Sequence, residues 1–543
     1  MKLLLPLLLF AGPALPTLGQ VAPPFTDSNL PLVVIDTQGS TIVDDPKVAA
    51  QMRIIDRGPG QRNALTDVPN QYKGRIGIEL RGSSSQSMPK KSYGLETLDR
   101  DGEELDTTLL GMPAEHDWVL TANYADKTLL RNSLTYELAS QLGQYASRSR
   151  YCELFLNGEY KGVYVLGEKI KRGSNRVNIS KLKSTDVRGD AVTGGYLLKL
   201  DKLTGTPAGG FYSRQADPDF PTNAAPYIQV EYPKLKDLVP AQLNYIAAYI
   251  DSFEVALAGP NFTDPAVGYR RYLDVPSFID YFLLTELSRN VDSFYSSTFF
   301  YKDRSSKGGK LVMGPVWDFD LAWHNANYND SHLTEGWQYT QTGPFWRRRL
   351  LQDPAFTEAL YSRWTVLRSA QLSEEHLYHM IDSSATQLNE SQERNFQAWP
   401  IMGQYVWPNP EPIATSYAGE ISNIKQWVHD RLLWMDNNLP GRPNGSITST
   451  QAQRTTELEL VAFPSPFSDN LTIRYEQRVA GAVSLELLST LGRVVSRQQL
   501  TNQAAGSQTS TISNVADLPA GLYFLRLTSP AGSQTLRVQK LAI

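Results

Sequence analysis

Asp318 and Asp320 are separated by one residue in the motif GPVWDFD (residues 314–320). If this segment is extended, the two side chains share one face of a strand. Two carboxylates on one face repel each other unless a cation or a proton lies between them. Hard oxygen ligands of this kind favour Mg²⁺ or Ca²⁺ over zinc. The pattern therefore indicates a divalent-cation site, and its alternative is a pair of turn or capping aspartates.

A second group of polar residues begins at Arg81 and continues through Ser83 and Ser84 in the motif RGSSS (residues 81–85). Lys90 and Lys91 follow a few residues later. A Gly-Ser turn between two strands presents backbone N–H groups and hydroxyls, and with cations just beyond it suits a phosphate. The alternative is an ordinary polar hairpin with surface lysines, since turns are usually solvated.

Four further charged residues lie at the ends of predicted elements. Glu168 ends the apolar run YVLGE, where it is either an exposed strand end or an ion-pair partner. Kinases hold their phosphate-binding lysine with such a glutamate. Asp292 follows a predicted helix over 278–290. Asp126 and Arg131 precede another helix, and Arg131 pairs either with a phosphate or with a structural carboxylate.

These residues fall in one large mixed region, residues 21–440, which we expect to be α+β or two-lobed. Its first half is rich in strand patterns, and Asn157-Gly158 between two apolar runs predicts a tight hairpin. Its second half is helical, with periodic apolar residues and capping signals at Asp274, Asp353 and Ser373.

The two ends of the chain differ from this central region. Residues 1–20 have a positive start, a short apolar stretch and small residues, which predict a cleaved export signal. No later stretch has the length and apolarity of a membrane span. Residues 441–455 are rich in Gly, Pro, Ser and Thr and are expected to form a linker. Residues 456–543 contain short strand patterns at regular spacing, which predict a small all-β sandwich.

Composition limits the possible functions. The formal net charge of −4 provides no basic footprint for nucleic acid, so we expect no nucleic-acid partner. Hydrophobic residues make up 41% and charged residues 20%, which is ordinary for a globular protein. Cys152 is the single cysteine, so the chain has no internal disulfide. Because it lies in an apolar run, we expect Cys152 to be a buried strand residue.

A series of motifs over roughly residues 75–330 resembles the CotH (spore-coat protein H) kinase-like family in order and spacing. The motifs are RGSSS…PKKSY, DWVLTANYADKTLLRN, YCELFLNGEYKGVYVLGEKIKR, GGYLLKLD, RNVDSFYSSTFFYKD and GPVWDFDLAWHN. The resemblance implies a divergent protein-kinase-like domain that binds ATP with Mg²⁺. In its studied branch the family phosphorylates serines of secreted coat proteins.

The resemblance also implies roles for the basic residues and their partners. Lys90 or Lys91 would neutralise the ATP phosphates, and the sequence leaves open which one, since strand neighbours face opposite ways. Glu168 would hold that lysine. Arg81 and the turn 83–85, which includes Ser83 and Ser84, would shape the phosphate end of the pocket.

The acidic residues receive roles in the same way. Asp292 would accept or orient the proton of the substrate hydroxyl, Asp318 would bind Mg²⁺, and Asp320 would be a second or outer ligand. The coat-protein branch carries asparagine five residues after the catalytic aspartate, where this chain has Ser297. A hydroxyl is a poorer Mg²⁺ ligand than a carboxamide oxygen, so this departure bears on activity.

The C-terminal region resembles the type IX secretion C-terminal sorting domain. The residues that carry this resemblance are FPSPF from Phe463, LLSTLGRVV from Leu487, LPAGLY from Leu518 and a terminal Lys540. Family members usually have Pro-Asn-Pro where this chain has Pro-Ser-Pro. The tail implies recognition by the type IX secretion machinery and a secreted or cell-surface location. Its alternative is an ordinary carbohydrate-binding or adhesive sandwich.

Together these observations predict an exported atypical kinase that transfers the γ-phosphoryl group of ATP to Ser or Thr of a secreted or surface protein. One alternative is a surface binding protein or adhesin that keeps the fold without the chemistry. Another is a Ca²⁺-stabilised glycan-binding protein. The alternatives differ in ligand response, because only an intact nucleotide site is stabilised by ATP with Mg²⁺.

Overall fold

The computed structural model describes residues 25–203, 209–215, 217, 225–340, 343–442, 460–463, 467–477, 480–489, 493–513, 515–529 and 532–541. The chain divides into two compact units, Met1–Asn444 and Gly445–Ile543. The expected export signal, residues 1–20, and most of the expected linker, residues 441–455, lie outside the described residues. The two units are described separately below.

The first unit begins with a closed β-barrel in the strand order β1-β2-β3-β4-β7-β9-β8. The barrel closes by parallel pairing of β1 with β8, and the other neighbours are antiparallel. Its strands are β1 (Leu32–Asp36), β2 (Val48–Ile55), β3 (Tyr72–Arg81), β4 (Ser92–Leu98), β7 (Asp117–Thr121), β8 (Ser149–Leu156) and β9 (Glu159–Glu168). A small ribbon of β5 (Thr107–Leu109) and β6 (Met112–Glu115) lies between β4 and β7 in the chain.

The predicted hairpin at Asn157-Gly158 joins β8 to β9. Both residues have positive φ, 52° and 81°, as a two-residue hairpin turn of this type requires. Apolar side chains that alternate along these strands fill the barrel interior. Cys152 is among them with 0% exposure, which confirms that it is a buried strand residue.

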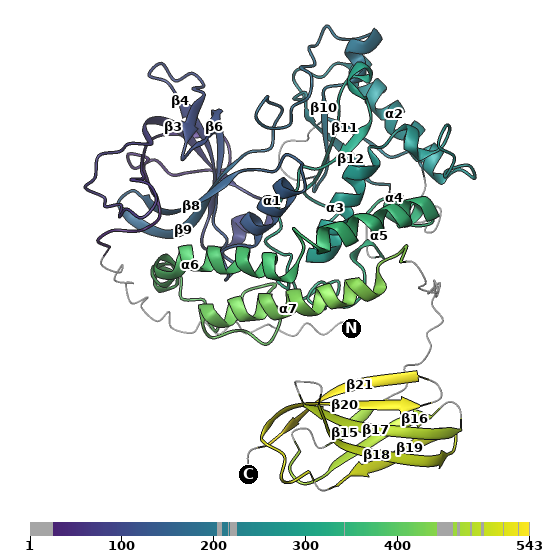
Figure 1. The fold of residues 1–543 in the computed structure, drawn as a ribbon. Helices are drawn as coiled ribbons and strands as arrows, with labels where there is room; N and C mark the ends of the chain where they lie inside the picture. Colours follow the sequence, from purple (N-terminus) through teal and green to yellow (C-terminus); the bar gives the residue numbers. More distant parts are fainter. Residues whose placement is uncertain are drawn as a thin grey trace, which may run out of the picture. The chain divides into compact units, whose positions relative to one another are not determined.

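A second sheet follows, with five strands in the order β11-β12-β10-β13-β14. Its strands are β10 (Tyr196–Leu200), β11 (Gly210–Tyr212), β12 (Tyr227–Tyr232), β13 (Thr298–Lys302) and β14 (Leu311–Met313). Figure 1 shows the barrel and this sheet in different parts of the first unit, with helix α1 between them in that view. The sheet shares one large apolar core with the helices, whereas the barrel has a core of its own.

Helices dominate the second half of the first unit, as the sequence predicts. They are α1 (Arg131–Gln141), α2 (Pro240–Ala258), α3 (Val275–Ser288), α4 (Trp346–Leu350), α5 (Pro354–Arg368), α6 (Glu374–Ala398) and α7 (Tyr417–Asn438). The predicted caps are confirmed, because Asp274, Asp353 and Ser373 each accept a backbone hydrogen bond from the first turn of α3, α5 and α6. Helices α6 and α7 pack against each other, and α6 also packs against β9.

The second unit is all-β, with sheets β15-β16-β19 and β18-β17-β20-β21. Its strands are β15 (Val461–Phe463), β16 (Leu471–Gln477), β17 (Gly481–Ser489), β18 (Val494–Gln503), β19 (Gly506–Ile512), β20 (Gly521–Ser529) and β21 (Gly532–Lys540). Residues from both sheets, such as Ile473 and Leu485, form one core, as in a β-sandwich. Within the described residues of the whole chain, no helix has the length and apolarity to span a bilayer.

Candidate active site

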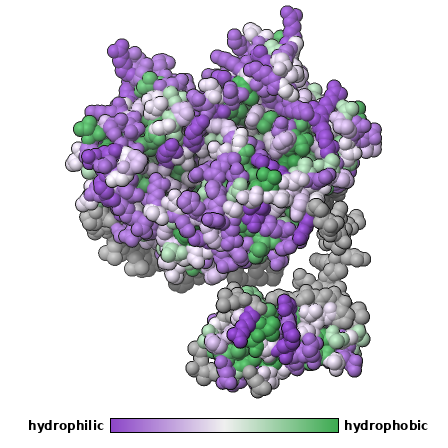
Figure 2. All heavy atoms as spheres, viewed as in Figure 1, coloured by the Kyte–Doolittle hydropathy of each residue, from purple (hydrophilic) through white to green (hydrophobic). Residues whose placement is uncertain are grey.

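A cleft of about 630 Å³ in the first unit collects residues from the barrel, from the second sheet and from the loops that follow α3 and β14. The space-filling view is notched between the part of the surface that carries β3 and β4 and the part that carries β10 and β12 (Figure 2). Pockets of this size accommodate cofactor-sized ligands. Of the residues predicted from sequence, the cleft contains Arg81, Ser83, Ser84, Ser85, Lys90, Asp292, Ser297, Asp318 and Asp320.

The serine-rich turn lies where the sequence analysis expects it, between the end of β3 at Arg81 and the start of β4. Gly82 has φ of 108°, and a Cβ atom at this position would lie 2.0 Å from Oγ of Ser85. Only glycine therefore allows this close turn. A short 3₁₀ helix, Ser84–Ser87, follows. The guanidinium of Arg81 lies 5.6 Å from the ring centroid of Trp317, which brings this positive charge next to the motif of the paired acids.

Asp292 reaches the cleft because α3 ends just before it. Arg289 caps α3 in the left-handed conformation with φ of 47°, which turns the chain out of the helix. Burial, together with the nearby carboxylates of Asp318 and Asp201, raises the pKa of Asp292 to about 6. A carboxylate with this pKa is mostly ionised near neutral pH and remains a competent proton acceptor.

Asp318 and Asp320 also converge in the cleft, but not in the predicted way. The extended arrangement, one of the two alternatives that the sequence leaves open, does not occur, because β14 ends at Met313 and Asp318 has φ of 65°, in the left-handed region. Burial and the Asp318 carboxylate, to which Asp320 is hydrogen-bonded, raise the pKa of Asp320 well above its ordinary value. Two acidic side chains thus lie in contact in a buried part of the cleft.

The donor set of this end of the cleft fits a divalent cation. Asp292, Asp318 and Asp320 offer only carboxylate oxygens, which are the ligands of Mg²⁺ and Ca²⁺ in proteins. Burial and the Asp318 carboxylate both raise the pKa of Asp320, and a bound cation would offset both effects. The same cleft is lined by the serine turn, with its hydroxyls and N–H groups, and by the positive charge of Arg81, and these groups suit phosphate.

The twin lysines have local partners instead of the roles expected of them. Nζ of Lys90 is fully enclosed and donates to the carbonyl of Val163 at 2.5 Å and to Oδ1 of Asn395 at 2.9 Å. Burial lowers the pKa of Lys90 to about 7. Nζ of Lys91 donates to the carbonyl of Gln86 at 2.6 Å. Among the residues that the structure describes, Lys91 is not part of the cleft lining, whereas Lys90 is.

Glu168 lies outside the described lining of the cleft, and its predicted ion pair with Lys90 or Lys91 is wrong. Its carboxylate is fully buried and accepts from Nη1 of Arg148 at 2.7 Å and from the hydroxyl of Tyr145 at 3.1 Å. The Glu168 carboxylate is therefore engaged by the partly exposed Arg148 and by Tyr145, and not by a lysine.

A different cluster of lysines and acidic residues lies in the cleft. Nζ of Lys199 lies 3.4 Å from the carboxylate of Asp201 and 3.5 Å from that of Glu231, and Lys234 forms a further ion pair with Glu231. Lys199 and Asp201 belong to the motif GGYLLKLD on β10, and Glu231 belongs to the neighbouring strand β12. The sequence contains the motif, but the pairing of β10 with β12 that creates this cluster is not visible in it.

Asp126 and Arg131 form a structural ion pair. Both side chains are almost completely buried, and Arg131 also donates from Nε to the carbonyl of Trp323 at 3.1 Å. Among the described residues neither is part of the cleft lining, so the phosphate-binding alternative for Arg131 has no support.

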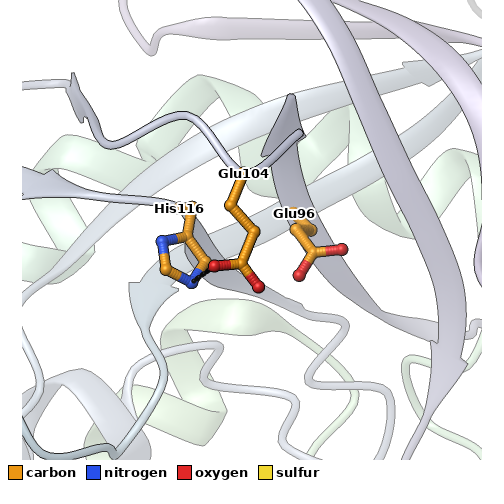
Figure 3. Close-up of side chains that lie close together, drawn as sticks. All are labelled: Glu96, Glu104 and His116. Carbon is orange, nitrogen blue, oxygen red and sulfur yellow. Dashed lines mark ion pairs between the residues drawn. The ribbon is translucent and has the colours of Figure 1, made fainter. Parts of the chain in front are cut away.

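A second cluster of acidic residues surrounds His116 on the barrel, where Glu96 and Glu104 approach its ring (Figure 3). Nε2 of His116 lies 3.2 Å from Glu104, and the dashed line in Figure 3 marks this ion pair. However, Nζ of Lys171 lies 3.0 Å from the same nitrogen, and Nδ1 lies 2.7 Å from Asp106. The Lys171 ammonium, which also pairs with Glu115 and Asp117, thus already occupies the space beside this ring nitrogen, so the cleft is the better candidate for chemistry.

The C-terminal region of the chain matches a known family. The family model described as secretion system C-terminal sorting domain matches residues 461–542, and the predicted type IX sorting tail is confirmed. The protein is therefore exported, either to the cell surface or to the medium.

A relative among the curated proteins is the inner spore coat protein H of Bacillus subtilis (strain 168), which is 31% identical over 101 residues. The match covers 19% of this chain and 25% of that protein, so the chain spans a quarter of the length of this relative. The family model described as CotH kinase protein matches residues 78–435, which include every cleft residue predicted from sequence. The chain belongs to the CotH kinase protein family.

Proposed function

We propose that this protein is an exported atypical kinase with a divergent kinase-like domain, and that it transfers the γ-phosphoryl group of ATP to a Ser or Thr hydroxyl of a secreted or surface protein. The observation that carries the proposal is that three carboxylates, a serine turn and basic residues line one cleft. Phosphoryl transfer needs this combination, because catalysis depends on positioning and on neutralising the phosphate charge.

Each part of the cleft has a role in this proposal. Asp318 and Asp320 would hold Mg²⁺, which supplies charge neutralisation and orients the phosphates. Arg81 and the turn 83–85 would bind phosphate oxygens. Lys199, held beside Glu231, would supply the positive charge that the sequence analysis expects from Lys90 or Lys91. Lys90 would have a structural role, because hydrogen bonds from its Nζ connect β9 to α6.

Asp292 would receive the proton of the acceptor hydroxyl. As the acceptor oxygen bonds to the γ-phosphorus, the bond from that phosphorus to the bridging oxygen of ADP breaks, and the hydroxyl proton passes to Oδ of Asp292. The pKa of about 6 suits this task, because the group is ionised at neutral pH and still basic enough to take the proton.

The proposal is tested by the melting temperature of the protein with ATP and Mg²⁺, followed by transfer from labelled ATP to the exported proteins of the host. Ligand binding to the folded state stabilises it by mass action, so ATP with Mg²⁺ should raise the melting temperature. Absence of any nucleotide response at millimolar ATP would contradict the proposal. Stabilisation by Ca²⁺ and sugar with ATP inert would favour a glycan-binding protein.

A second candidate function is a surface binding protein or adhesin that retains the cleft without turnover. Ser297 favours it, because a hydroxyl stands where the coat-protein branch has an asparagine ligand, and this hydroxyl is hydrogen-bonded to Asp318. The two candidates are separated by combining the assays. Nucleotide binding without transfer to any exported protein, even at long incubation times, would support the binding protein.

A further inference from the structure

The backbone that carries the acid pair is not held by a sheet. β14 ends at Met313, and the residues from there to Asp320 form neither strand nor helix. Asp318 has φ of 65°, a left-handed conformation that is unfavourable for a non-glycine residue and is maintained by surrounding contacts. The contacts that impose it therefore determine where the carboxylates point.

These contacts come from helix α1. The backbone N–H of Asp318 donates to the hydroxyl oxygen of Tyr136 at 3.2 Å. The next backbone N–H, of Phe319, donates to Oδ1 of Asn132 at 2.6 Å. The segment 314–323, which carries Asp318 and Asp320, is called the acid loop below. Two of its consecutive backbone amides are thus held by side chains that lie far earlier in the sequence.

The same face of α1 also holds the end of the loop. Nε1 of Trp323 donates to Oγ1 of Thr135 at 2.8 Å, and Nε of Arg131 donates to the carbonyl of Trp323. Positions separated by three or four residues lie on one side of a helix, which is why these side chains reach one loop. The ring of Tyr136 also stacks on that of Trp317, with centroids 5.7 Å apart and an interplanar angle of 12°.

We propose that Asn132 and Tyr136 are positioning residues that fix the direction of the Asp318 and Asp320 carboxylates and thereby set the divalent-cation affinity of the cleft. The inference rests on the proposed function, because it takes the two aspartates as metal ligands. Both positioning side chains are buried, with exposures of 4% and 8%, so their hydrogen bonds do not compete with bulk water. Residues that orient metal ligands typically affect metal affinity by about 10- to 100-fold.

The test compares Tyr136→Phe and Asn132→Ala with Tyr196→Phe as a matched control. Tyr136→Phe keeps the ring that stacks on Trp317 and removes only the oxygen that accepts from Asp318. Tyr196 is also buried, and its hydroxyl donates to the carbonyl of Val192 at 2.7 Å, outside the acid loop. The control therefore removes a buried tyrosine hydroxyl of equal size without touching the loop.

Two measurements on the full-length protein without nucleotide separate positioning from general destabilisation. The first is hydrogen exchange of the peptide covering residues 314–325, and the second is Mn²⁺ affinity by electron paramagnetic resonance. We expect the two cleft variants, Tyr136→Phe and Asn132→Ala, to exchange the Asp318 and Phe319 amides at least about tenfold faster than the wild type. We also expect them to bind Mn²⁺ at least about tenfold more weakly, while Tyr196→Phe matches the wild type in both.

The outcomes distinguish failure of this inference from failure of the proposed function. If the wild type binds Mn²⁺, Asp318→Ala abolishes that binding, and both cleft variants bind and exchange like the wild type, the positioning role is wrong. If the wild type binds no Mn²⁺, the proposed metal site is wrong and affinity cannot be set by α1. In that case, hydrogen exchange of the peptide covering residues 314–325 still shows whether α1 holds the acid loop in place.

Discussion

The hydroxyl of Ser297 donates a hydrogen bond of 3.0 Å to Oδ2 of Asp318. Ser297 is thus adjacent to the proposed metal ligand, although its own oxygen is a neutral hydroxyl. Its backbone has φ of 49°, in the left-handed region. Asparagine adopts this region more readily than serine, so the backbone at this position is compatible with the asparagine found in the coat-protein branch.

Ser297→Asn should therefore strengthen Mg-ATP binding. The carboxamide oxygen is a better ligand for a hard cation than a hydroxyl, and we expect a gain of roughly three- to tenfold in affinity by titration calorimetry. Ser296→Asn is the matched control, since the hydroxyl of Ser296 donates to Asp201 instead of Asp318. Equal affinity in wild type and Ser297→Asn would mean that position 297 is not a ligand position.

Asp318→Ala should abolish stabilisation by Mg-ATP. At a nucleotide concentration 100 times the dissociation constant, the wild type should gain about 2.7 kcal/mol of unfolding free energy, and the variant should gain almost none. Asp382→Ala is a suitable control, because Asp382 pairs with Lys425 on an exposed surface. A wild-type nucleotide response in Asp318→Ala would remove Asp318 from the metal site.

Asp292→Asn should retain nucleotide binding and lose phosphoryl transfer. A carboxamide cannot accept the hydroxyl proton, so we expect transfer to fall by roughly a hundredfold or more. Labelled-ATP transfer gives the rate, and the melting temperature with Mg-ATP confirms that the nucleotide still binds. Unchanged turnover would show that another residue takes the proton.

Lys199→Met should weaken Mg-ATP binding, because it removes the cation that lies between Asp201 and Glu231 in the cleft. We expect a loss of about tenfold, which corresponds to about 1.4 kcal/mol. Lys91→Met provides the comparison, since Lys91 is oriented toward the carbonyl of Gln86. If Lys91→Met weakens binding and Lys199→Met does not, the original expectation for the twin lysines is restored.

Lys90 should make stability depend on pH. Burial lowers its pKa in the folded protein from 10.5 to about 7. Between these two values the unfolded chain binds a proton that the folded protein does not, so the unfolding free energy rises with pH. The slope reaches at most about 1.4 kcal/mol per pH unit.

Urea unfolding from pH 6.5 to 9.5 measures this slope. Lys90→Met should show a smaller rise over that range, although it is less stable at every pH because Val163 and Asn395 lose their donor. Lys91→Met is the control. Parallel pH profiles for wild type and Lys90→Met would show that Lys90 remains charged in the folded state.

The elements predicted correctly from sequence are those whose signals are local. The hairpin at Asn157-Gly158 depends on two adjacent residues that tolerate positive φ. The cap at Asp274 depends on a bond to Ser277, three residues away. The serine turn after Arg81 depends on Gly82, where a side chain does not fit. Such features are fixed within a few residues and can be recognised in one sequence.

The predictions that failed depend on residues distant in the chain. The run around Asp318 has a strand-like composition, yet its backbone N–H groups donate to Tyr136 and Asn132, and Asp318 has a left-handed conformation. Glu168 ends the apolar strand β9, where a lysine partner is expected, but its carboxylate accepts a hydrogen bond from Arg148 instead. Strand register and helix docking determine these contacts, and a single sequence does not display them.

The burial of Cys152 has a practical consequence. Its side chain is 0% exposed and its pKa is raised to about 12 by desolvation, so almost no thiolate forms at neutral pH. Maleimides and other thiol reagents should therefore leave the native chain unmodified. A cysteine introduced at an exposed position on the rim of the cleft, such as Trp407 with 52% exposure, would become the sole reactive thiol. Single-site spin or fluorophore labelling should therefore need no replacement of the native cysteine.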